Sequence, residues 1–555
     1  MSDTDPSPTS GQPTGEQPTP EQPTTGQPTT DQPRPGPSTL DEPTSDAPTT
    51  ARATTEPSAT GIDDRSRRRA AVRPGFTGPG ALWQYVAFLV LFVLGGATFI
   101  AVTPPGLNPD EPAHVFRAYQ VAHGGLVAQE AEGIQGIRDG DPGGYIPTAW
   151  TKLFDDAHFT RGFEDQPSFR DLDWSALGAI HDDGTTGWQT FTNTVQYPPV
   201  AYVPQAVALR IGEALDLGVL AQLELGRAFG LLAVAGLLLA AVRLTPVGRL
   251  TFFAVGLLPS VIGQAAAFSA DGVTIALCFL ATALVLRWSL RTGAPTWWRW
   301  IGLGVLFVAI ALVKPTYAPI AVIAAVIPIL NPAARRLWHL VGAGAVIAIA
   351  AGVTLGWLRA TSWVTQGVNP LNHPDQQRAF LLEHPLVFVK AVFRSVVLDY
   401  PTGLTTEKGE IWRGVFGAFS WLRAPLPMVF VILLVIALVL SMLVVERHER
   451  LPVATLRRGV LWRVVVAVAI AIVVAGVCLA LYIYYTADQG QWLQGLQGRY
   501  FLPVVPALLL LFLGGRLVST RGVRPFVFAA AAVSLVAAVV TIDLHFYQSV
   551  TPFFG

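Results

Sequence analysis

The sequence is poor in charge and in cysteine. Only 14% of its 555 residues are charged, whereas soluble domains carry about 25%, so a water-soluble enzyme of this length is excluded. The two cysteines, Cys278 and Cys478, lie within apolar runs, which indicates neither a disulfide framework nor a thiolate metal site. Acidic and basic residues are equal in number, with 38 of each, so nothing favours a nucleic-acid partner. The remaining class is a membrane protein with many spans.

Several catalytic and transport signatures are also absent. The sequence has no Walker loop, no His-Glu-x-x-His zinc helix and no Gly-x-Ser-x-Gly nucleophile elbow. Its long apolar runs hold few charged residues near their centres, whereas ion-coupled transporters place ionisable groups there. This distribution argues against a carrier driven by protons or sodium.

Residues 1–80 differ in composition from the rest of the chain. Thirteen of the 43 prolines lie in the first 60 residues, many of them in a Gln-Pro-Thr repeat. Such a segment cannot bury apolar surface, so we expect a disordered Pro/Thr-rich cytoplasmic tail. No apolar core follows Met1, which excludes a signal peptide. A ligand for a proline-reading module is an alternative.

Beyond the tail, apolar runs recur at the length of about 20 residues that crosses a bilayer. We predict an all-α polytopic membrane protein with about eleven transmembrane helices. The predicted spans lie near residues 81–103, 222–243, 251–268, 272–290, 300–316, 317–330, 337–357, 426–445, 462–485, 501–516 and 525–545. Segment 198–216 is predicted to lie at the outer surface or to re-enter it, because a span there would invert every later loop.

Charge in the short loops predicts the orientation. With the tail inside, the five short inward loops hold fifteen arginines, while the short outward turns offer only Lys314 and Arg499. This asymmetry is typical of positive-inside topology, and it predicts a cytoplasmic N-terminus and an external C-terminus. The predicted domains are an N-terminal transmembrane module with its external loop, a second external loop and a C-terminal transmembrane module, over residues 81–357 (loop 104–221), 358–425 and 426–555.

The densest group of polar residues follows the first predicted span. Asp110, Glu111, His114 and Arg117 lie a few residues beyond it, and Pro112 suits the first turn of a helix. An acid before a proline at a helix start is often only a cap, and a histidine can simply form a hydrogen bond within a loop. As a set at the membrane surface, however, two adjacent carboxylates with a histidine and an arginine favour a functional site.

Other candidate side chains lie at the predicted outer ends of later spans. Asp271 begins the fourth span, where helix capping alone could explain it. Lys314 lies in an apolar hairpin, which is costly unless the side chain snorkels or meets an anion. Arg499 precedes the tenth span, where it could bind an anion or anchor to lipid headgroups. The other binding candidates are Tyr317, Gln497 and Tyr500, the last also typical of an aromatic belt. Two pairs are interpreted as structural ion pairs: Arg210 with Glu213, and Glu224 with Arg227.

Five short motifs occur in a fixed order along the chain. They span residues 104–114, 197–205, 268–272, 314–317 and 497–503. They resemble those of a bacterial membrane family catalogued as a domain of unknown function, DUF2142, and the resemblance covers roughly residues 80–550. That family is in turn similar to the fold-C (GT-C) glycosyltransferases, multi-span enzymes that use sugars linked to lipid phosphates. The resemblance places Asp110 at the acidic position of the first external loop, with Glu111 as its neighbour.

The resemblance implies a membrane glycosyltransferase at the outer face of the cytoplasmic membrane. Such an enzyme would move a sugar, with inversion, from a polyprenyl-phosphate donor to a cell-envelope glycan or lipid. Asp110 would act as base on the acceptor hydroxyl, and Arg499 and Lys314 would hold the departing phosphate. Glu111 and His114 would orient Asp110, or bind a divalent cation together with it.

The alternative hypothesis is a non-catalytic membrane protein. It would be a flippase for lipid-linked glycans or an assembly partner in envelope synthesis. Such a role requires a path across the membrane with polar residues at several depths along the spans. The sequence places its polar residues mostly at the outer ends, which favours the first hypothesis.

Overall fold

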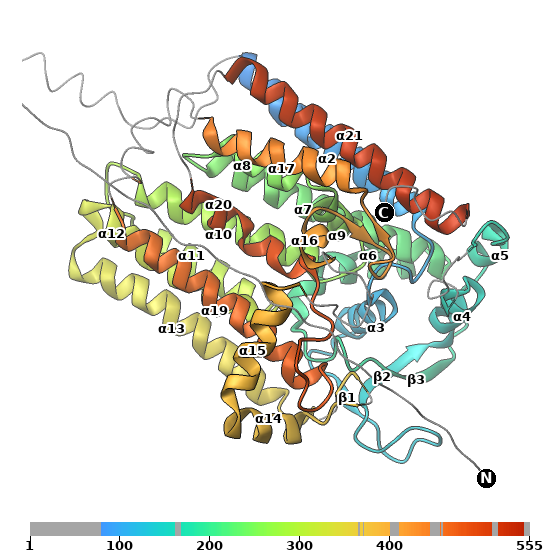
Figure 1. Cartoon of the computed structure of the whole chain (residues 1–555). Coiled ribbons are helices and arrows are strands. Elements are labelled where there is room, and N and C mark those ends of the chain that lie inside the picture. Colours follow the sequence, from blue (N-terminus) through green and yellow to red (C-terminus); the bar gives the residue numbers. More distant parts are fainter. Residues whose placement is uncertain are drawn as a thin grey trace, which may run out of the picture. The chain divides into compact units, whose positions relative to one another are not determined.

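The computed structural model describes most of the chain beyond the tail. The described residues are 79–160, 168–364, 367–369, 371–399, 410–444, 456, 459–512 and 520–548. The predicted tail, residues 1–80, falls outside them except for its last two positions. Within the described residues helices dominate, and two small sheets lie in the segments between long helices (Figure 1). The predicted class, a mostly helical membrane protein, is confirmed at this level.

Six helices of the described residues are long and apolar enough to cross a membrane. With a rise of 1.5 Å per residue, 24 helical residues extend about 36 Å, which exceeds the hydrocarbon thickness of about 30 Å. The six helices are α2 (Pro79–Val102), α7 (Val219–Leu244), α10 (Asp271–Ser289), α13 (Leu337–Ala360), α19 (Leu461–Tyr484) and α21 (Thr520–Tyr547).

The described residues do not show the predicted eleven spans, because they form shorter helices in the other five predicted spans. Two consecutive helices bent by 58° raise the count to seven if they form one span; they are α8 (Arg249–Gly256) and α9 (Pro259–Ala266). Pro319 and Pro503 each remove a backbone donor inside an apolar segment. The shorter apolar elements are α11 (Trp297–Ala311), η3 (Pro315–Ala325) with α12 (Val326–Leu330), α17 (Met428–Leu443), and η6 (Gly498–Val504) with α20 (Val505–Leu511).

A long insertion between α2 and α7 carries the larger sheet. Its elements are α3 (Glu111–Ala122), β1 (Gln129–Glu130), β2 (Pro142–Pro147), α4 (Thr148–Asp156), α5 (Trp174–Gly178), β3 (Thr186–Thr190), η2 (Pro199–Tyr202) and α6 (Val203–Ala214). The strands are antiparallel in the order β1-β2-β3, with Tyr145 opposite Trp188. The segment predicted not to span, 198–216, forms η2 and α6, is absent from the candidate spans of the described residues, and packs on α3 and α7.

A second insertion between α13 and α17 is smaller. It contains α14 (Pro374–Glu383), α15 (Pro385–Val396), α16 (Glu410–Phe416) and a two-stranded sheet of β4 (Ala418–Phe419) and β5 (Ala424–Pro425). A short turn, η4 (Pro332–Ala334), precedes α13. α14 packs on α19, and α16 packs on η6. The second insertion therefore contacts α19 and η6.

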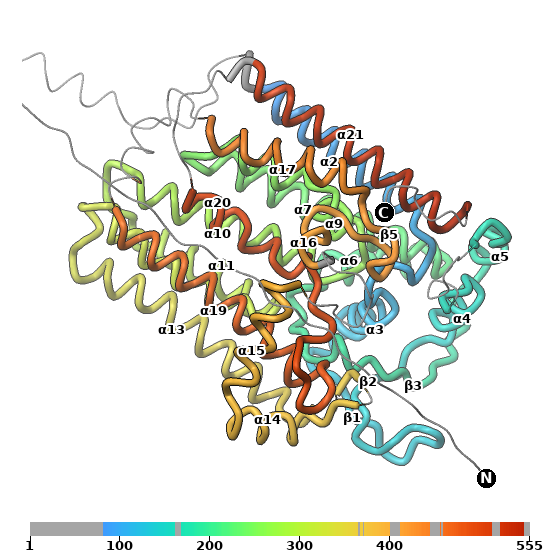
Figure 2. Tube along the Cα trace, viewed as in Figure 1, coloured from blue at the N-terminus to red at the C-terminus, as the bar shows by residue number. Residues whose placement is uncertain are grey.

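The core lies around α10, which is the most buried of the six long helices. It packs against α7, α9, α11 and η6. The first and last described helices, α2 and α21, lie side by side (Figure 2), and the rings of Trp83 and Phe528 are 5.1 Å apart at their contact. Elements from both ends of the described chain thus close one flank of the bundle.

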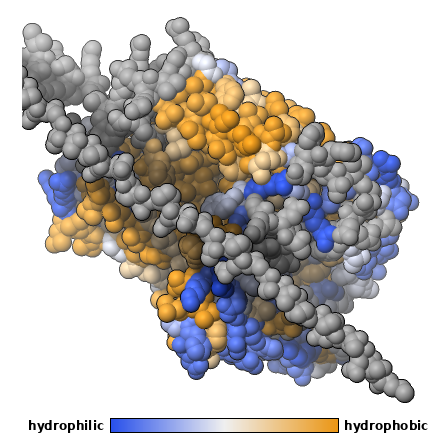
Figure 3. Space-filling view, viewed as in Figure 1, coloured by the Kyte–Doolittle hydropathy of each residue, from blue (hydrophilic) through white to orange (hydrophobic). Residues whose placement is uncertain are grey.

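The surface divides into apolar and polar regions. Apolar side chains gather over α2, α17 and α21, and polar side chains gather over the end of the molecule that carries α4 and α5 (Figure 3). Exposed side chains of the long helices include Leu94, Leu232 and Ile349. A continuous apolar surface on helices of this length is typical of lipid contact. The chain is therefore a multi-pass membrane protein.

One glycine of α7 permits a close approach that the site depends on. A Cβ atom on Gly226 would lie 2.1 Å from Cε2 of the buried Phe268, whereas a Cβ on Gly236 of the same helix would have no neighbour within 4 Å. We predict that Gly226→Ala lowers stability by about 1–3 kcal/mol through overpacking, and that Gly236→Ala is neutral or stabilising because alanine favours helices. Thermal unfolding of the detergent-solubilised variants measures the difference, and equal melting temperatures would contradict this packing.

Candidate functional site

Asp110 lies where the loop after α2 turns into α3. Its backbone adopts a left-handed conformation with φ 62°, and its side chain does not cap its own helix. Asparagine and aspartate tolerate this conformation better than other side chains. The carboxylate instead accepts hydrogen bonds from Nδ2 of Asn193 at 2.9 Å and from Nη2 of Arg499 at 3.0 Å. It remains 26% exposed, so the turn presents a partly open carboxylate.

Arg499 links Asp110 to a second, more buried ion pair. Its Nε atom lies 3.4 Å from Oδ2 of Asp271, the first residue of α10. Oδ1 of Asp271 accepts a hydrogen bond of 2.6 Å from Nζ of Lys314, which precedes η3. The four side chains therefore form one cluster of two carboxylates and two cations. The pairing compensates the cost of placing these charges away from water.

Tyrosine rings surround the buried lysine. Nζ of Lys314 lies 5.0 Å from the ring centroids of both Tyr197 and Tyr500, within the range of cation–π attraction. The hydroxyl of Tyr317 donates a hydrogen bond of 2.8 Å to the carbonyl oxygen of Tyr500. Burial raises the pKa of the Tyr197 phenol above its usual value. The tyrosines thus stay neutral and cover the lysine.

Glu111 points away from Asp110 into a separate buried ion pair. Its two oxygens accept hydrogen bonds of 2.8 Å and 2.6 Å from Nε and Nη2 of Arg227 on α7, and neither side chain is exposed. The same carboxylate accepts from the backbone nitrogens of Gly106 and Phe268 at 3.0 Å and 3.2 Å. Arg227 also donates to the carbonyl oxygen of Thr103. Glu111 therefore joins the loop after α2 to α7 and to the segment before Asp271.

Both structural ion pairs expected from the sequence are present, with different importance. Nη1 of Arg210 lies 2.7 Å from Glu213 on the exposed face of α6. Nη1 of Arg227 lies 3.7 Å from Glu224, so its contact with Glu111 is the shorter one. The main partner of Arg227 thus comes from a different part of the chain, not from its own helix.

His114 lies behind the cluster on α3. Its Nδ1 atom is 2.7 Å from the hydroxyl of Tyr202, and its ring stacks on Tyr197 with centroids 5.8 Å apart. Burial lowers the pKa of His114 from 6.5 to about 4, although Asp110 and Asp271 oppose the shift. The imidazole is therefore neutral near pH 7. It supports the ring of Tyr197 and does not contribute a cation.

Arg117 is not brought to the cluster. Its guanidinium donates to the carbonyl oxygens of Tyr197, Gly125 and Leu126 and to Oε1 of Gln120. Burial lowers the pKa of this guanidinium. The side chain fastens the end of α3 to two loops of the first insertion, which is a structural role.

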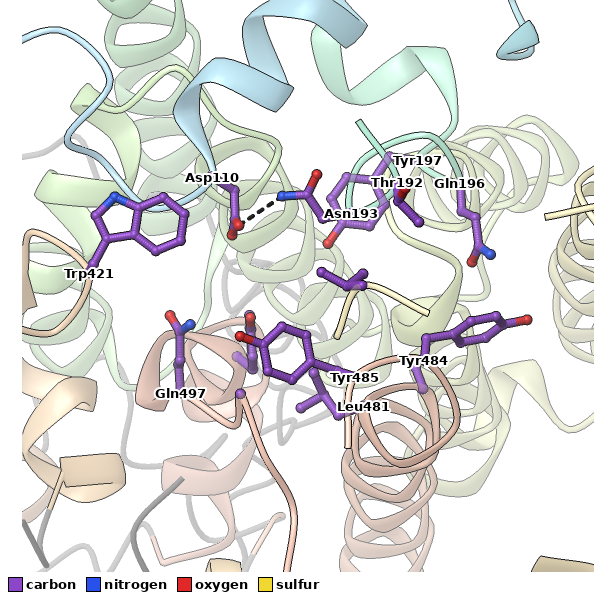
Figure 4. Close-up of a pocket in the computed structure, with 14 residues that line it drawn as sticks. Asp110, Thr192, Asn193, Gln196, Tyr197, Trp421, Leu481, Tyr484, Tyr485 and Gln497 are labelled. Carbon is purple, nitrogen blue, oxygen red and sulfur yellow. Dashed lines mark hydrogen bonds between the residues drawn. The ribbon is translucent and has the colours of Figure 1, made fainter. Parts of the chain in front are cut away.

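Asp110 faces a cavity of about 160 Å³. Figure 4 shows Asp110 and Asn193 on one side of it and Leu481, Tyr485 and Gln497 on the facing side. The residues that line the cavity are Asp110, Thr192, Asn193, Gln196, Tyr197, Val368, Trp421, Ala480, Leu481, Tyr484, Tyr485, Gly495, Gln497 and Tyr500. The walls therefore combine aromatic rings with carboxylate and amide groups.

The cavity contains residues that the sequence did not single out. Asn193 and Gln196 lie four residues and one residue before the motif at 197–205, so the motif could have indicated that they belong to the site. Trp421, Tyr484 and Tyr485 had no such signal, because aromatic residues near the end of a span are typical of an interfacial belt. Among the described residues, Oε1 of Gln497 and Nη1 of Arg499 are buried without a hydrogen-bond partner. Gln497 lines the cavity, and Arg499 donates to Asp110, which faces it.

A divalent cation does not fit the residues suggested for it. The described part of the chain holds no group of three or more His, Cys, Asp or Glu side chains placed to bind a metal. Both oxygens of Glu111 engage Arg227, and Nδ1 of His114 engages Tyr202. Asp110 is thus the one residue of the suggested ligand set, Asp110, Glu111 and His114, that faces the cavity.

The fold and the site define a class: a multi-pass membrane protein with a largely buried cluster of two carboxylates and two cations at one end of its helices. The profile of a family described as predicted membrane proteins, DUF2142, matches residues 91–508, and the chain belongs to that family. No curated protein and no solved structure matches the chain. The family assignment supports the membrane class and names no activity or substrate.

The Glu111–Arg227 pair yields a stability prediction. Glu111→Gln removes the nearer of the two counter-charges of the buried Arg227, and breaking a buried pair typically costs about 3–5 kcal/mol. The control Asp156→Asn breaks the exposed pair with Lys152, which is worth at most about 1 kcal/mol. Thermal unfolding in detergent distinguishes them: we expect a much lower melting temperature for Glu111→Gln only. Similar melting temperatures for the two variants would contradict the role of Glu111.

Proposed function

We propose that the protein is an inverting glycosyltransferase that uses a polyprenyl-phosphate sugar as donor and a cell-envelope glycan or lipid as acceptor. The observation that carries the proposal is the position of Asp110. Its carboxylate is partly exposed, faces the cavity and forms an ion pair with Arg499. A general base and a phosphate-binding cation in one small site are what this reaction requires. The motifs resemble DUF2142, and the similarity expected between that family and the fold-C glycosyltransferases favours the same assignment.

Asp110 acts as the base in this proposal. Its carboxylate accepts the proton of the acceptor hydroxyl as that oxygen attacks the anomeric carbon. A new carbon–oxygen bond forms to the acceptor, the bond between the anomeric carbon and the phosphate oxygen breaks, and the electron pair leaves with the lipid phosphate. Asn193, which donates to Oδ1 of Asp110, orients the carboxylate for the transfer.

Arg499 is the cation that meets the leaving phosphate. Its Nη1 atom has no hydrogen-bond partner within the described residues, and the neighbouring Gln497 amide lines the cavity. Lys314 lies behind Tyr197 and Tyr500. It attracts the phosphate without touching it, because electrostatic attraction is strong where the dielectric constant is low. Asp271 pairs with both cations and is a positioning residue.

The cavity walls suit a sugar. The rings of Tyr197, Tyr485 and Tyr500 offer apolar faces on which the C–H faces of a pyranose can pack, and Gln196 and Asn193 offer amide groups to its hydroxyls. Aromatic bodies with polar tips are suited to ligands of mixed polarity. The aromatic and amide composition therefore agrees with a glycosyl group as the ligand.

The arginines of the long helices support an external site. Arg243 and Arg287 lie in the last turns of α7 and α10, and the first turn of α10 contributes Asp271 to the charge cluster. Arg463 lies in the first turn of α19, whose last turn lines the cavity. The positive-inside rule places such arginines in the cytoplasm. The site then faces outward, where an envelope acceptor is available.

The base assignment predicts the effect of one substitution. Asp110→Asn keeps the shape of the side chain but replaces one of the two accepting oxygens with an amide donor and removes the basic carboxylate, so we expect turnover to fall by a factor of about 10²–10⁴. The assay follows sugar transfer from a panel of polyprenyl-phosphate sugars to a cell-envelope glycan or lipid acceptor by purified protein in nanodiscs. Asp156→Asn, on the exposed face of α4, is the matched control. Turnover by Asp110→Asn at the control rate would overturn the assignment, as would transport of the lipid without any acceptor.

Arg499 provides a separate test of phosphate recognition. The planar guanidinium of arginine has several donors that can contact Asp110, Asp271 and a ligand at once. Lysine keeps the positive charge but lacks this arrangement of donors. Because a hydrogen bond to a charged group is worth about 1.5–3 kcal/mol, we expect Arg499→Lys to lower kcat/KM for the donor by about 10- to 100-fold. Arg138→Lys, in an exposed loop pair with Asp141, should leave kcat/KM unchanged. An unchanged kcat/KM in Arg499→Lys would contradict the phosphate role.

A further inference from the structure

Helices α14 and α15 expose an apolar face that no described element covers. Val389 is 58% exposed, and the apolar residues that share its exposure in this helix pair are Leu382, Leu386, Phe393, Val397 and Leu398. Leu386, Val389 and Phe393 follow helical spacing and form one stripe along α15, which Val397 continues just past the end of the helix. The helices have 10 and 12 residues, too few to cross a bilayer.

The helix pair lies at the level where a transmembrane helix ends. Nε2 of Gln377 on α14 donates to the carbonyl oxygen of Tyr482, and Arg378 donates to the hydroxyl of Tyr484. The rings of Phe388 and Tyr482 are 5.3 Å apart. Tyr482 and Tyr484 belong to the last turn of α19, which has the length of a full span. α14 and α15 therefore pack against the end of α19.

The pair is also fastened to the segment that leads from α19 to the charge cluster. Oγ of Ser395 accepts from the backbone nitrogen of Leu493 at 2.7 Å, and Arg394 donates to Oε1 of Gln491 at 3.0 Å. His373 contacts Asp488 at 2.7 Å. This segment continues to Gln497 and Arg499, so the helix pair adjoins one wall of the cavity.

The charges on α15 complement a lipid surface. The helix carries Lys390 and Arg394 and no acidic residue. Lys390 is exposed next to the apolar stripe, and apolar and polar side chains meet over α14 and α15 in Figure 3. A helix with an apolar stripe bordered by basic residues is typical of binding in the plane of a membrane interface.

We propose that α14 and α15 form an interfacial platform that lies in the headgroup region of the bilayer, with the stripe of α15 among the upper acyl chains and Lys390 against lipid phosphates. The second predicted external loop, 358–425, is then not wholly in water. Because Arg378 holds Tyr484 of the cavity wall, the lipid surface supports one side of the candidate site. The proposal concerns membrane contact and stands independently of sugar transfer.

Site-directed fluorescence quenching tests this platform in the full-length protein. The two native cysteines are buried, so single cysteines at exposed positions can be labelled with a bimane fluorophore in nanodiscs that contain phosphatidylglycerol. Val389→Cys and, independently, Leu386→Cys report on the stripe. Asp375→Cys in the first turn of α14, where the side chain is 71% exposed, is the aqueous reference. Ile349→Cys on the exposed surface of α13 is the lipid reference.

The proposal gives a defined quenching pattern. Bimane at 389 and 386 should be quenched by nitroxide lipids labelled near the headgroup, and its quenching by aqueous iodide should be several-fold weaker than at 375. Quenching at 349 should require nitroxide placed deeper in the acyl chain. Iodide quenching at 389 and 386 equal to that at 375, without lipid quenching, would overturn the proposal and leave the stripe as a surface for a protein partner.

Discussion

The candidate site depends on the mutual neutralisation of four charged side chains at the end of a membrane bundle. Asp110, Asp271, Lys314 and Arg499 come from four separate segments, and each is held within 3.4 Å of an opposite charge in the cluster. None of them would be stable in this position without the others, because an uncompensated charge in a low-dielectric region is costly. The cluster therefore links the beginning of the described chain to its last part.

A separate ion pair, Glu111 with Arg227, positions the two acids of this cluster. Glu111 and Arg227 are fully buried. Their hydrogen bonds connect the loop after α2, helix α7 and the backbone of Phe268. Asp110 immediately precedes Glu111 of this network, and Asp271 follows its other member, Phe268, by three residues. Adjacent acids thus have different tasks: Glu111 fixes the loop, and Asp110 faces the cavity. Phe268 in turn requires the close approach that Gly226 allows.

Much of this could be anticipated from the sequence, and the remainder depends on contacts that the sequence hides. Each of the predicted apolar runs contains helical structure, but prolines and short lengths leave six or seven spans by length and composition in the part of the chain that the structure describes. The motifs contained Asp110, Asp271, Lys314 and Arg499, which the structure brings together. Spacing alone could not separate Asp110 from Glu111, because the left-handed backbone of Asp110 decides where each side chain points. The aromatic walls at Trp421 and Tyr485 were indistinguishable from an interfacial belt.

The central claim, that this charge cluster and its cavity bind a sugar linked to a lipid phosphate, is tested most directly by a cryo-EM structure in nanodiscs with a non-hydrolysable polyprenyl-phosphate sugar analogue. The account predicts the phosphate within hydrogen-bond distance of Arg499, the sugar between Tyr197 and Tyr485, and the anomeric carbon facing Asp110. An analogue bound elsewhere, with the cavity left without it at saturating concentration, would contradict the account.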